Sequence, residues 1–414
     1  GLSGLNASSK NLEIIGNNIA NANTYGTKVS RAEFSDVYAA ALNGAGSNAV
    51  GIGTRLAAVA QQFTQGSITT TDNPMDLAVN GAGFFQVTDG KNPTMYTRNG
   101  QFKVDADGYI VNNAKQQLMG YAADGTGVIQ PGQAVPLQLR TAGIAPKATD
   151  EVTLELNLHA KGAVTSANGF DPTNASTYNN ATSLATYDSQ GIAVPVTFYF
   201  QKAGDNSWNV YATADGAVTN GGAPLVSPMT FLPDGSLDSA NSSPSGLTAL
   251  TLTIDAVASS ANNAGHGAIS SALDLGSLTQ FGSAFAVTNV DQSGYAAGQL
   301  SSLAIESDGV ITARYSNGQS RPAGQIEIAN FRNPQGLQPM GDNAWARTSA
   351  SGDPVTGVPG DGNLGSLQSG ALEESNIDLT GELVSMITAQ RIYQANAQTI
   401  KTQDQVLQTL VNLR

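Results

Sequence analysis

Side chains that commonly do chemistry are scarce in this sequence. Its 414 residues include no Cys and two His, His159 and His266. A chain without Cys can form no disulfide, no thiolate metal site and no Cys nucleophile. Both His lie in stretches rich in small residues with no ligand set around them, so we interpret them as solvated. We find no Gly-rich phosphate loop, nucleophile elbow or metal-binding helix motif.

One acidic stretch has the spacing with which a calcium loop begins. Asp105, Asp107 and Gly108 fit that pattern, but Tyr109 and Ile110 stand where the loop needs a ligand and a Gly. A hairpin turn explains the same residues. The sequence therefore predicts no cofactor, no metal site and no enzyme activity.

The composition narrows the range of partners. Charged residues make up 12% of the chain and the formal net charge is −13, which argues against binding to nucleic acid or to an anionic membrane surface. No run of apolar residues is long enough to insert into a membrane. The first residues lack a basic region followed by an apolar block, so we expect no cleaved signal peptide. The absence of Cys suits a protein that works outside the cell.

Because no catalytic, metal or cofactor site is predicted, we look for functional residues in the helices that are predicted at the two ends of the chain. Residues 375–414 predict one long helix, with Asn376 and Asp378 as N-cap residues and a length of about 50 Å at 1.5 Å per residue. Apolar positions follow one another at steps of four and three, which is the spacing of a coiled-coil seam. The seam consists of Leu379, Leu383, Met386, Gln390, Tyr393, Ala397, Ile400, Asp404, Leu407 and Val411.

The outward face of this helix carries amides rather than charges. Gln and Asn residues fill positions where a solvated helix usually shows Glu and Lys pairs. Amides form hydrogen bonds without the desolvation cost of charges, so this face suits contact with neighbouring helices. From periodicity alone, an ordinary amphipathic helix packed on its own domain remains the alternative.

A second amphipathic helix is predicted at the start of the chain. Leu2, Leu5, Leu12 and Ile19 share one heptad seam, with Ile15 and Ala22 beside it, while Ser9 and Gly16 interrupt it. Short helices are marginal in water, so we expect both ends to pair and to gain their order when several copies come together. We expect subunit assembly to use Leu5, Leu12, Ile15, Ile19, Asn17, Asn18, Asn21, Leu379, Leu383, Met386, Tyr393, Ala397, Ile400, Leu407 and Val411.

The middle of the chain reads as β structure. Short apolar runs alternate with turn pairs that are typical of hairpins. These pairs include Asn80-Gly81, Asp89-Gly90, Asn99-Gly100, Asp107-Gly108 and Asp124-Gly125. The fold class is mainly β with α-helical termini, and two β domains are nested. We place a terminal helical domain at 1–28 and 371–414, a connector at 29–73 and 358–370, a discontinuous inner β domain at 74–146 and 285–357, and an inserted outer β domain at 147–284.

Several motifs resemble a known family. The stretch from Gly16 to Lys28 resembles the Asn-Asn-Ile-Ala-Asn…Thr-x-Gly-Phe-Lys signature of the axial proteins of the bacterial flagellum, the rod and hook subunits. Thr27 stands where that family usually has Phe. Further similarity lies in Gly83-Phe84-Phe85, in residues 96–102, 118–121, 341–345 and 370–376, and in the final helix from Leu383 to Asp404.

The resemblance implies a structural subunit of the flagellar hook, a curved helical tube that acts as a universal joint and transmits torque from rod to filament. It implies an extracellular location in the hook of the basal body, and type III export without a cleaved signal. It also implies these partners: copies of itself, the rod, the hook cap, the hook-filament junction, hook-length control proteins and the export apparatus. We expect an initiator Met and a few residues before Gly1.

Two alternatives stay open. A distal rod subunit would share both ends, but it is typically a shorter chain, and the large insert at 147–284 favours the hook. A secreted β-rich adhesin or carbohydrate-binding protein would share the acidic, Cys-free composition, but it would not need a helix at each end.

Overall fold

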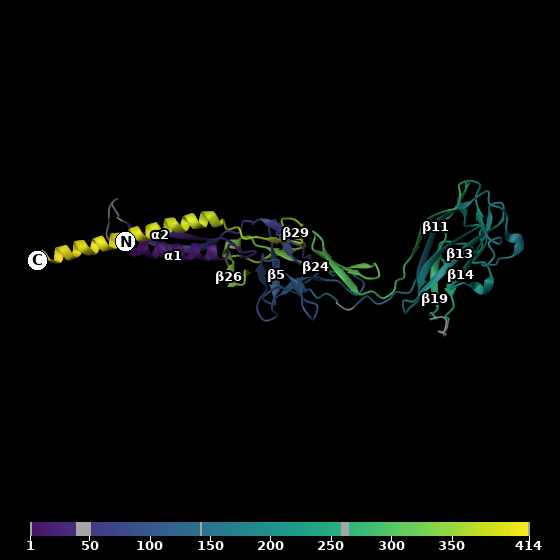
Figure 1. The fold of residues 1–414 in the computed structure, drawn as a ribbon, viewed down its shortest axis with the longest axis horizontal. Coiled ribbons are helices and arrows are strands. Elements are labelled where there is room, and N and C mark those ends of the chain that lie inside the picture. Colours follow the sequence, from purple (N-terminus) through teal and green to yellow (C-terminus); the bar gives the residue numbers. More distant parts are fainter. Residues whose placement is uncertain (1, 39–50, 141–142, 258–264, 413–414) are drawn as a thin grey trace. The chain divides into compact units, whose positions relative to one another are not determined.

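The chain folds into two compact units. The computed structural model describes residues 2–38, 51–140, 143–257 and 265–412. Unit 1 comprises Gly1–Thr141, Ser301–Arg314 and Ser320–Arg414, and unit 2 comprises Ala142–Leu300 and Tyr315–Gln319. Strands dominate both units, and the long helices lie at the two ends of the chain (Figure 1), so the expected fold class is confirmed.

Unit 1 holds the helices α1 (Leu2–Ala20) and α2 (Leu379–Asn412). Beside α1 lies an antiparallel hairpin of β1 (Ser30–Tyr38) and β2 (Gly51–Gln61), in the stretch that the sequence marked as a connector. The tip of this hairpin lies outside the described residues. Two further antiparallel pairs join chain segments far apart in sequence: β3 (Ile68–Thr70) with β30 (Ala371–Glu373), and β4 (Leu77–Asn80) with β29 (Ser366–Ser369).

The main sheet of unit 1 is built from strands of both halves of the chain. Its path runs β22 (Leu300–Ile305), β23 (Val310–Tyr315), β24 (Ser320–Ile326), β9 (Gln117–Ala122), β5 (Phe84–Thr88), β6 (Met95–Thr97), β27 (Ala344–Ala346) and β26 (Gln338–Gly341). Beside this path lie β7 (Lys103–Val104), β8 (Ile110–Val111), β10 (Val135–Pro136), β25 (Ile328–Asn330) and β28 (Val355–Gly357). The early strands β5, β6 and β9 therefore pair with the late strands β25, β27 and β24.

Unit 2 packs two sheets around one apolar core. One sheet runs β18 (Leu250–Ile254), β19 (Ile269–Asp274), β11 (Glu151–His159) and β20 (Thr279–Phe281), with β21 (Ala286–Gln292) paired to β11. The other runs β12 (Asn180–Tyr187), β13 (Ala193–Gly204), β14 (Ser207–Ala214), β16 (Val226–Phe231) and β17 (Leu237–Asp238), with β15 (Ala217–Val218) paired to β14. Alternate residues of both sheets point inward, and Phe198, Phe200 and Trp208 are fully buried.

Unit 2 is wider than the insert placed at 147–284. Strand β21 pairs antiparallel with β11 from Val152 to Asn157, so residues 286–292 pack in unit 2. The sequence assigned these residues to the inner domain, because a strand that joins a distant partner leaves no local turn signal.

The two His differ from the interpretation made from the sequence. His266 is buried, and its Nδ1 lies 2.9 Å from the carbonyl oxygen of Gly267, so the expectation that it is solvated is wrong. His159 is half-buried, with Nδ1 3.0 Å from the carbonyl oxygen of Ser283. The structure explains the burial of His266 by a β-bridge to Val257, which the surrounding small residues did not signal.

Candidate assembly interface

The helices from the two ends of the chain pack side by side in unit 1 (Figure 1). Near the start of α1, a Cβ on Gly4 would lie 2.9 Å from Oδ1 of Asn396. Near its end, Nδ2 of Asn18 donates to Oε1 of Glu382 at 3.3 Å. Low residue numbers in α1 thus meet high numbers in α2, so the two helices run antiparallel.

Helix α1 is covered on a second side by the β1–β2 hairpin. The amide of Asn18 bonds to both backbone groups of Ser30, donating to its oxygen at 2.8 Å and accepting from its nitrogen at 3.0 Å. Ser3 packs against Gly53, where an added Cβ would lie 2.2 Å from the Ser3 hydroxyl. Because α1 touches both α2 and the hairpin, it is the covered member of the helix pair.

Helix α2 begins close to the residue that the sequence predicts, and of the two expected N-cap residues Asp378 caps the helix, whereas Asn376 does not. Oδ1 of Asp378 accepts from the Thr380 backbone nitrogen at 3.0 Å, which is N-cap geometry. Asn376 instead accepts from the Val29 nitrogen at 2.8 Å and donates to the Gln62 oxygen at 2.8 Å. Its side chain therefore fastens the approach to α2 onto the two strands of the hairpin stem.

Along most of its length α2 is exposed. Of its described residues only Ala389 is buried, while Val406, Leu407, Leu410 and Val411 are each more than half exposed. Residues 401–412, which we call the α2 extension, form the C-terminal third of the helix and measure about 18 Å at 1.5 Å per residue. In water an apolar surface of this kind is unfavourable unless another surface covers it.

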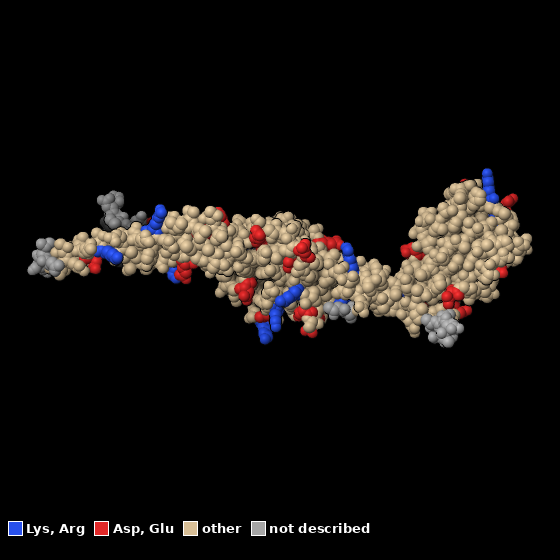
Figure 2. All heavy atoms as spheres, in the orientation of Figure 1, with Lys and Arg blue, Asp and Glu red and all other residues tan. Residues whose placement is uncertain are grey.

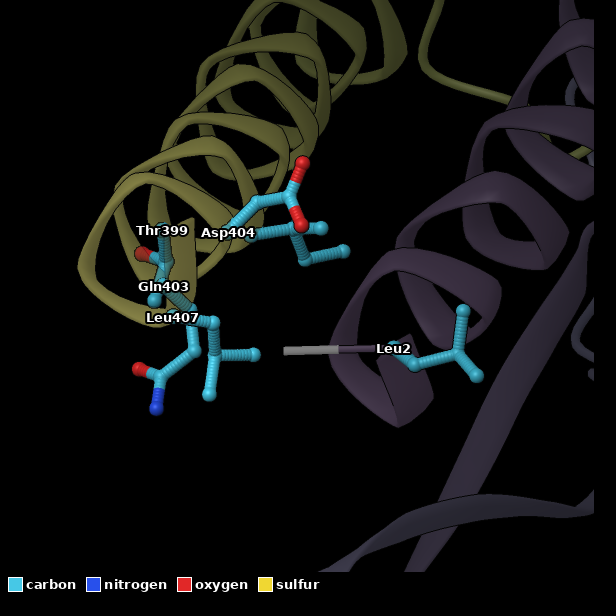
Figure 3. A pocket seen from close by; sticks show the side chains of 6 residues that line it. Leu2, Thr399, Gln403, Asp404 and Leu407 are labelled. Carbon is cyan, nitrogen blue, oxygen red and sulfur yellow. The ribbon is translucent and has the colours of Figure 1, made fainter. Parts of the chain in front are cut away.

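A groove lies between the start of α1 and residues 399–407 of α2. It has a volume of about 320 Å³ and is lined by Leu2, Thr399, Ile400, Gln403, Asp404 and Leu407. Figure 3 shows Gln403 and Leu407 of α2 beside the space next to Leu2 on α1. Only Asp404 among these residues is charged. The groove continues the apolar surface of the α2 extension to the start of α1.

Few charges interrupt the helix surfaces. Helix α2 carries Glu382, Arg391, Lys401 and Asp404 in 34 residues. Figure 2 shows the helical part of unit 1 as mostly uncharged surface with isolated charged side chains. A helical surface that is neutral and apolar can approach a second such surface without desolvating ions.

The residues expected to mediate assembly divide into two groups. On α1, Ile15 and Asn18 are buried, Leu5, Leu12, Ile19 and Asn21 are half-buried, and Asn17 is exposed. On α2, Met386 and Ala397 are half-buried, and Leu379, Leu383, Tyr393, Ile400, Leu407 and Val411 are exposed. Most of the α1 residues are thus at least partly covered within the chain, whereas most of the α2 residues are exposed.

A buried ionic cluster at the base of the helices escaped the sequence reasoning. Glu373 accepts from Nζ of Lys28 at 2.6 Å through Oε1 and from Nη1 of Arg98 at 3.1 Å through Oε2. We call these three residues the base cluster. Each is at most 4% exposed. One signal was available: Glu373 follows the apolar pair Ala371-Leu372 in a chain where charges are rare.

Burial acts against the two cations of the base cluster. It lowers the pKa of the Lys28 ammonium, and Glu373 opposes that change by attraction and by its hydrogen bond. Burial also lowers the pKa of the Arg98 guanidinium, with Glu373 again opposing. The carboxylate is therefore what allows both cations to remain charged away from water.

Other kinds of site find little support in the described part of the chain. No cluster of three or more His, Asp or Glu side chains there has the arrangement to hold a metal ion. Neither described helix is long and apolar enough to cross a membrane. The Asp105 stretch closes the β7–β8 hairpin, with Oδ1 accepting from the backbone nitrogens of Asp107 and Tyr109, as expected for a turn.

Comparison with known proteins gives the class to which this architecture belongs. Four family models match successive parts of the chain: Flagella basal body rod protein (residues 1–28), Flagellar hook protein FlgE/F/G D1 domain (78–166), Flagellar basal body protein FlaE D2 domain (157–295) and Flagellar basal body rod FlgEFG protein C-terminal (368–413). The first and last cover the regions of α1 and α2. Together they define an axial protein of the flagellum.

Full-length relatives identify the particular family. The chain is 42% identical to flagellar hook protein FlgE of Salmonella typhimurium over 100% of this chain and 98% of that protein. It is 41% identical to FlgE of Escherichia coli and 32% identical to FlgE of Borreliella burgdorferi, with the same coverage of both chains. The chain belongs to the flagellar hook protein FlgE family.

A solved structure supports the fold. The crystal structure of Helicobacter pylori flagellar hook protein FlgE2 superposes with a TM-score of 0.51 at 15% identity, covering 74% of this chain and 100% of that one.

Proposed function

We propose that this chain is a structural subunit of the bacterial flagellar hook, with no catalytic task. Copies join into a curved helical tube that connects rod and filament and passes torque around the bend. The observation that carries this proposal is the uncovered apolar surface of α2, above all the α2 extension. Family membership and an apolar helix that needs a partner lead to the same conclusion.

The helices would form the axial connection between copies. A contact between two different surfaces of identical subunits generates a filament when its rotation does not close into a ring. The α2 extension of one copy would cover apolar α2 residues of the next, such as Leu383, Val384 and Ile387, which are each about half exposed. Both surfaces carry few charges, so this contact needs little desolvation of ions.

Unit 2 would allow neighbours to slide as the bent tube rotates. Most of its large apolar side chains point into its own core, and its loops are rich in Ser, Thr, Asn and Gly. The ion pair of unit 2 that the structure describes, Lys147 with Asp150, is exposed. Small polar surfaces without a deep apolar interlock can change register at low cost, because water replaces each lost hydrogen bond.

The remaining assignments extend the same proposal. We infer an extracellular place in the hook of the basal body, and export by the type III apparatus without a cleaved signal. Contacts with the rod, the hook cap, the hook-filament junction and hook-length control proteins belong to that role. We also retain as a proposal a terminal helical domain at 1–28 with 371–414, a connector at 29–73 with 358–370, and an inner β domain around an inserted outer one, with the outer domain extended past 284 to include β21.

Electron microscopy of purified full-length chain and of hooks from a flagellated host lacking its own hook subunit tests the proposal. We expect tubes with the unaltered chain and none with Leu407→Gln/Val411→Gln, because the change makes two exposed apolar positions of the α2 extension polar. The matched control is Thr402→Ala/Thr409→Ala, which removes two hydroxyls that bond back to the Gln398 and Gln405 oxygens of the same helix and should leave tubes intact. Tubes of normal length from the Leu407→Gln/Val411→Gln chain would contradict the assigned interface.

A further inference from the structure

The base cluster joins four parts of the chain at one carboxylate. Lys28 ends the bend after α1, Glu373 ends β30 just before α2, and Arg98 follows β6 of the main sheet. The fourth part is the link after the hairpin, whose Gly66 nitrogen donates to Oε1 of Glu373 at 2.9 Å. The backbone oxygen of Glu373 also accepts from the Gly26 nitrogen at 2.9 Å.

The cations are held by further bonds to backbone. Nζ of Lys28 donates to the Thr64 oxygen at 2.8 Å, and Nη2 of Arg98 donates to the Gly81 oxygen at 2.8 Å. The guanidinium also lies 5.3 Å from the ring centre of Phe84. Directional bonds of this number fix the position of each group relative to the others far better than apolar contact does.

The backbone of the bend after α1 packs closely against the segment that follows β6. Gly26 has φ of +74°, and an added Cβ would lie 2.5 Å from the Asn99 nitrogen, so the bend presses directly on the main-sheet segment. A second polar tie lies nearby. Asn343, in the turn before β27, donates to the Tyr25 oxygen at 3.1 Å and accepts from the Thr27 hydroxyl at 3.0 Å. Thr27, which stands where the family usually has Phe, thus makes a hydrogen bond at this contact.

The charge balance suggests a role other than stability. Two cations face one carboxylate, and Arg98 Nε has no partner in the described residues, so burial is only partly compensated. Buried ion pairs are often no more stabilising than apolar residues of the same volume, but they can specify one geometry. A cluster that is costly to bury and links the helices to the sheet is well suited to fixing their relative position.

We propose that the base cluster is the clamp that holds the helix pair on the sheet of unit 1, so that torque entering through the helices turns the β part without slip. This inference rests on the proposed hook function. Lys28, Arg98 and Glu373 are positioning residues in this role. The clamp would determine the shape and stiffness of the assembled tube rather than the ability of the chain to fold.

The test replaces the cluster by apolar side chains of similar length, Lys28→Met/Arg98→Met/Glu373→Met, in the full chain. Thermal unfolding is measured on the purified protein, and tube curvature and swimming are measured in a host lacking its own hook subunit. We expect a Tm within about 5 °C of the unaltered chain. We also expect a spread of tube curvature about twofold wider and swimming speed reduced by about half, because the helix pair is no longer fixed in one position.

The control is Glu13→Gln, which removes one charge from the exposed Lys10–Glu13 pair on α1 and should change neither curvature nor swimming. Normal curvature and swimming from a stable triple variant would overturn the clamp. If the triple variant does not fold, Glu373→Asp is the test. This substitution keeps the negative charge but moves the carboxylate away from Lys28 and Arg98. A wider spread of tube curvature would support the clamp, and normal tubes would overturn it. Failure of both the unaltered chain and Glu13→Gln to build tubes would instead overturn the hook function, and this inference with it.

Discussion

Unit 2 and helix α2 differ in where their apolar side chains lie: unit 2 buries them in its own core, and α2 leaves many of them exposed. In unit 2 two sheets enclose a continuous apolar core, and Trp208 is fully buried with its Nε1 donating to Oε1 of Gln280 at 2.6 Å. In α2, Leu407 and Val411 are 54% and 74% exposed. Unit 2 completes its core with its own residues, whereas α2 leaves its apolar face for another molecule.

The difference separates folding from assembly. Apolar burial is the main favourable term in both processes, so a chain that is to polymerise must keep part of its apolar surface out of its own core. Here much of that part lies on α2, a helix with few charges, whereas the core of unit 2 is enclosed by its own sheets. The comparison can be tested because each unit holds one of the two Trp residues, Trp208 in unit 2 and Trp345 in unit 1.

The largest effect is expected from opening the closed core. Trp208→Ala should lower the free energy of unfolding of unit 2 by about 3–5 kcal/mol, because it leaves a cavity and removes the donor to Oε1 of Gln280. The fluorescence of Trp345 then reports unit 1, whose transition should stay unchanged. Simultaneous loss of both units at the lower denaturant concentration would contradict the independence of their cores.

The next effect concerns the open surface. In the dilute monomer, backbone amides of the α2 extension should exchange with solvent within about tenfold of the rate of an unfolded peptide, since no partner covers them. In assembled tubes the same amides should slow by at least about 100-fold, equivalent to about 2.7 kcal/mol. Amides of β13 serve as the internal control and should be equally protected in both states. Strong protection of the extension in the monomer would show that α2 is already complete.

A smaller loss of stability is expected for unit 1 at alkaline pH. Burial raises the pKa of Tyr121 to about 12 from 10.0, helped by the hydrogen bond from its hydroxyl to Oε1 of Glu327 at 2.8 Å. The unfolded chain releases this proton first, so the stability contributed by Tyr121 is complete below pH 10 and is lost as the pH rises towards 12. Unfolding of Trp208→Phe, followed through Trp345 across that range, measures the loss. In Tyr121→Phe this part of the pH dependence should disappear, and its persistence would assign it to another group.

The smallest effect belongs to the exposed ion pair on α1. Lys10 and Glu13 lie 2.7 Å apart with both side chains more than half exposed. Glu13→Gln should therefore change the free energy of unfolding by less than about 0.5 kcal/mol, as water screens such pairs. Denaturant titration of unit 1 checks this value. A loss several times larger would mean that α1 depends on surface charge, contrary to its coverage by α2 and the hairpin.

Local signals in the sequence predicted the local structure well. The pairs Asp89-Gly90, Asp107-Gly108 and Asp124-Gly125 lie at turns between antiparallel segments, and α1 and α2 occupy nearly the expected residues. Asn80-Gly81 and Asn99-Gly100 are different: neither closes a hairpin, because β4 pairs with β29, and β6 pairs with β5 and β27. An added Cβ on Gly100 would lie 1.6 Å from the Leu77 oxygen, so this Gly permits a close approach of backbone.

Long-range partners set the limit of the sequence reasoning. Glu373 meets Lys28 across 345 residues and Arg98 across 275, and no periodicity or turn signal connects such positions. The hydrogen bonds of Asn376 to Val29 and Gln62 were not predictable either, because the position of Asn376 just before α2 is typical of an N-cap residue. Composition could mark a rare charge in an apolar run, but only the fold shows which distant groups it meets.

The position of the exposed apolar residues on α2 gives each subunit a direction. The two helices run antiparallel, and Val406, Leu407, Leu410 and Val411 all lie exposed towards the C-terminal end of α2. In a row of subunits joined through this surface, it would stay uncovered at one end of the row only. The two tips of the tube are thus chemically distinct, and growth at one of them can be permitted while the other stays inert.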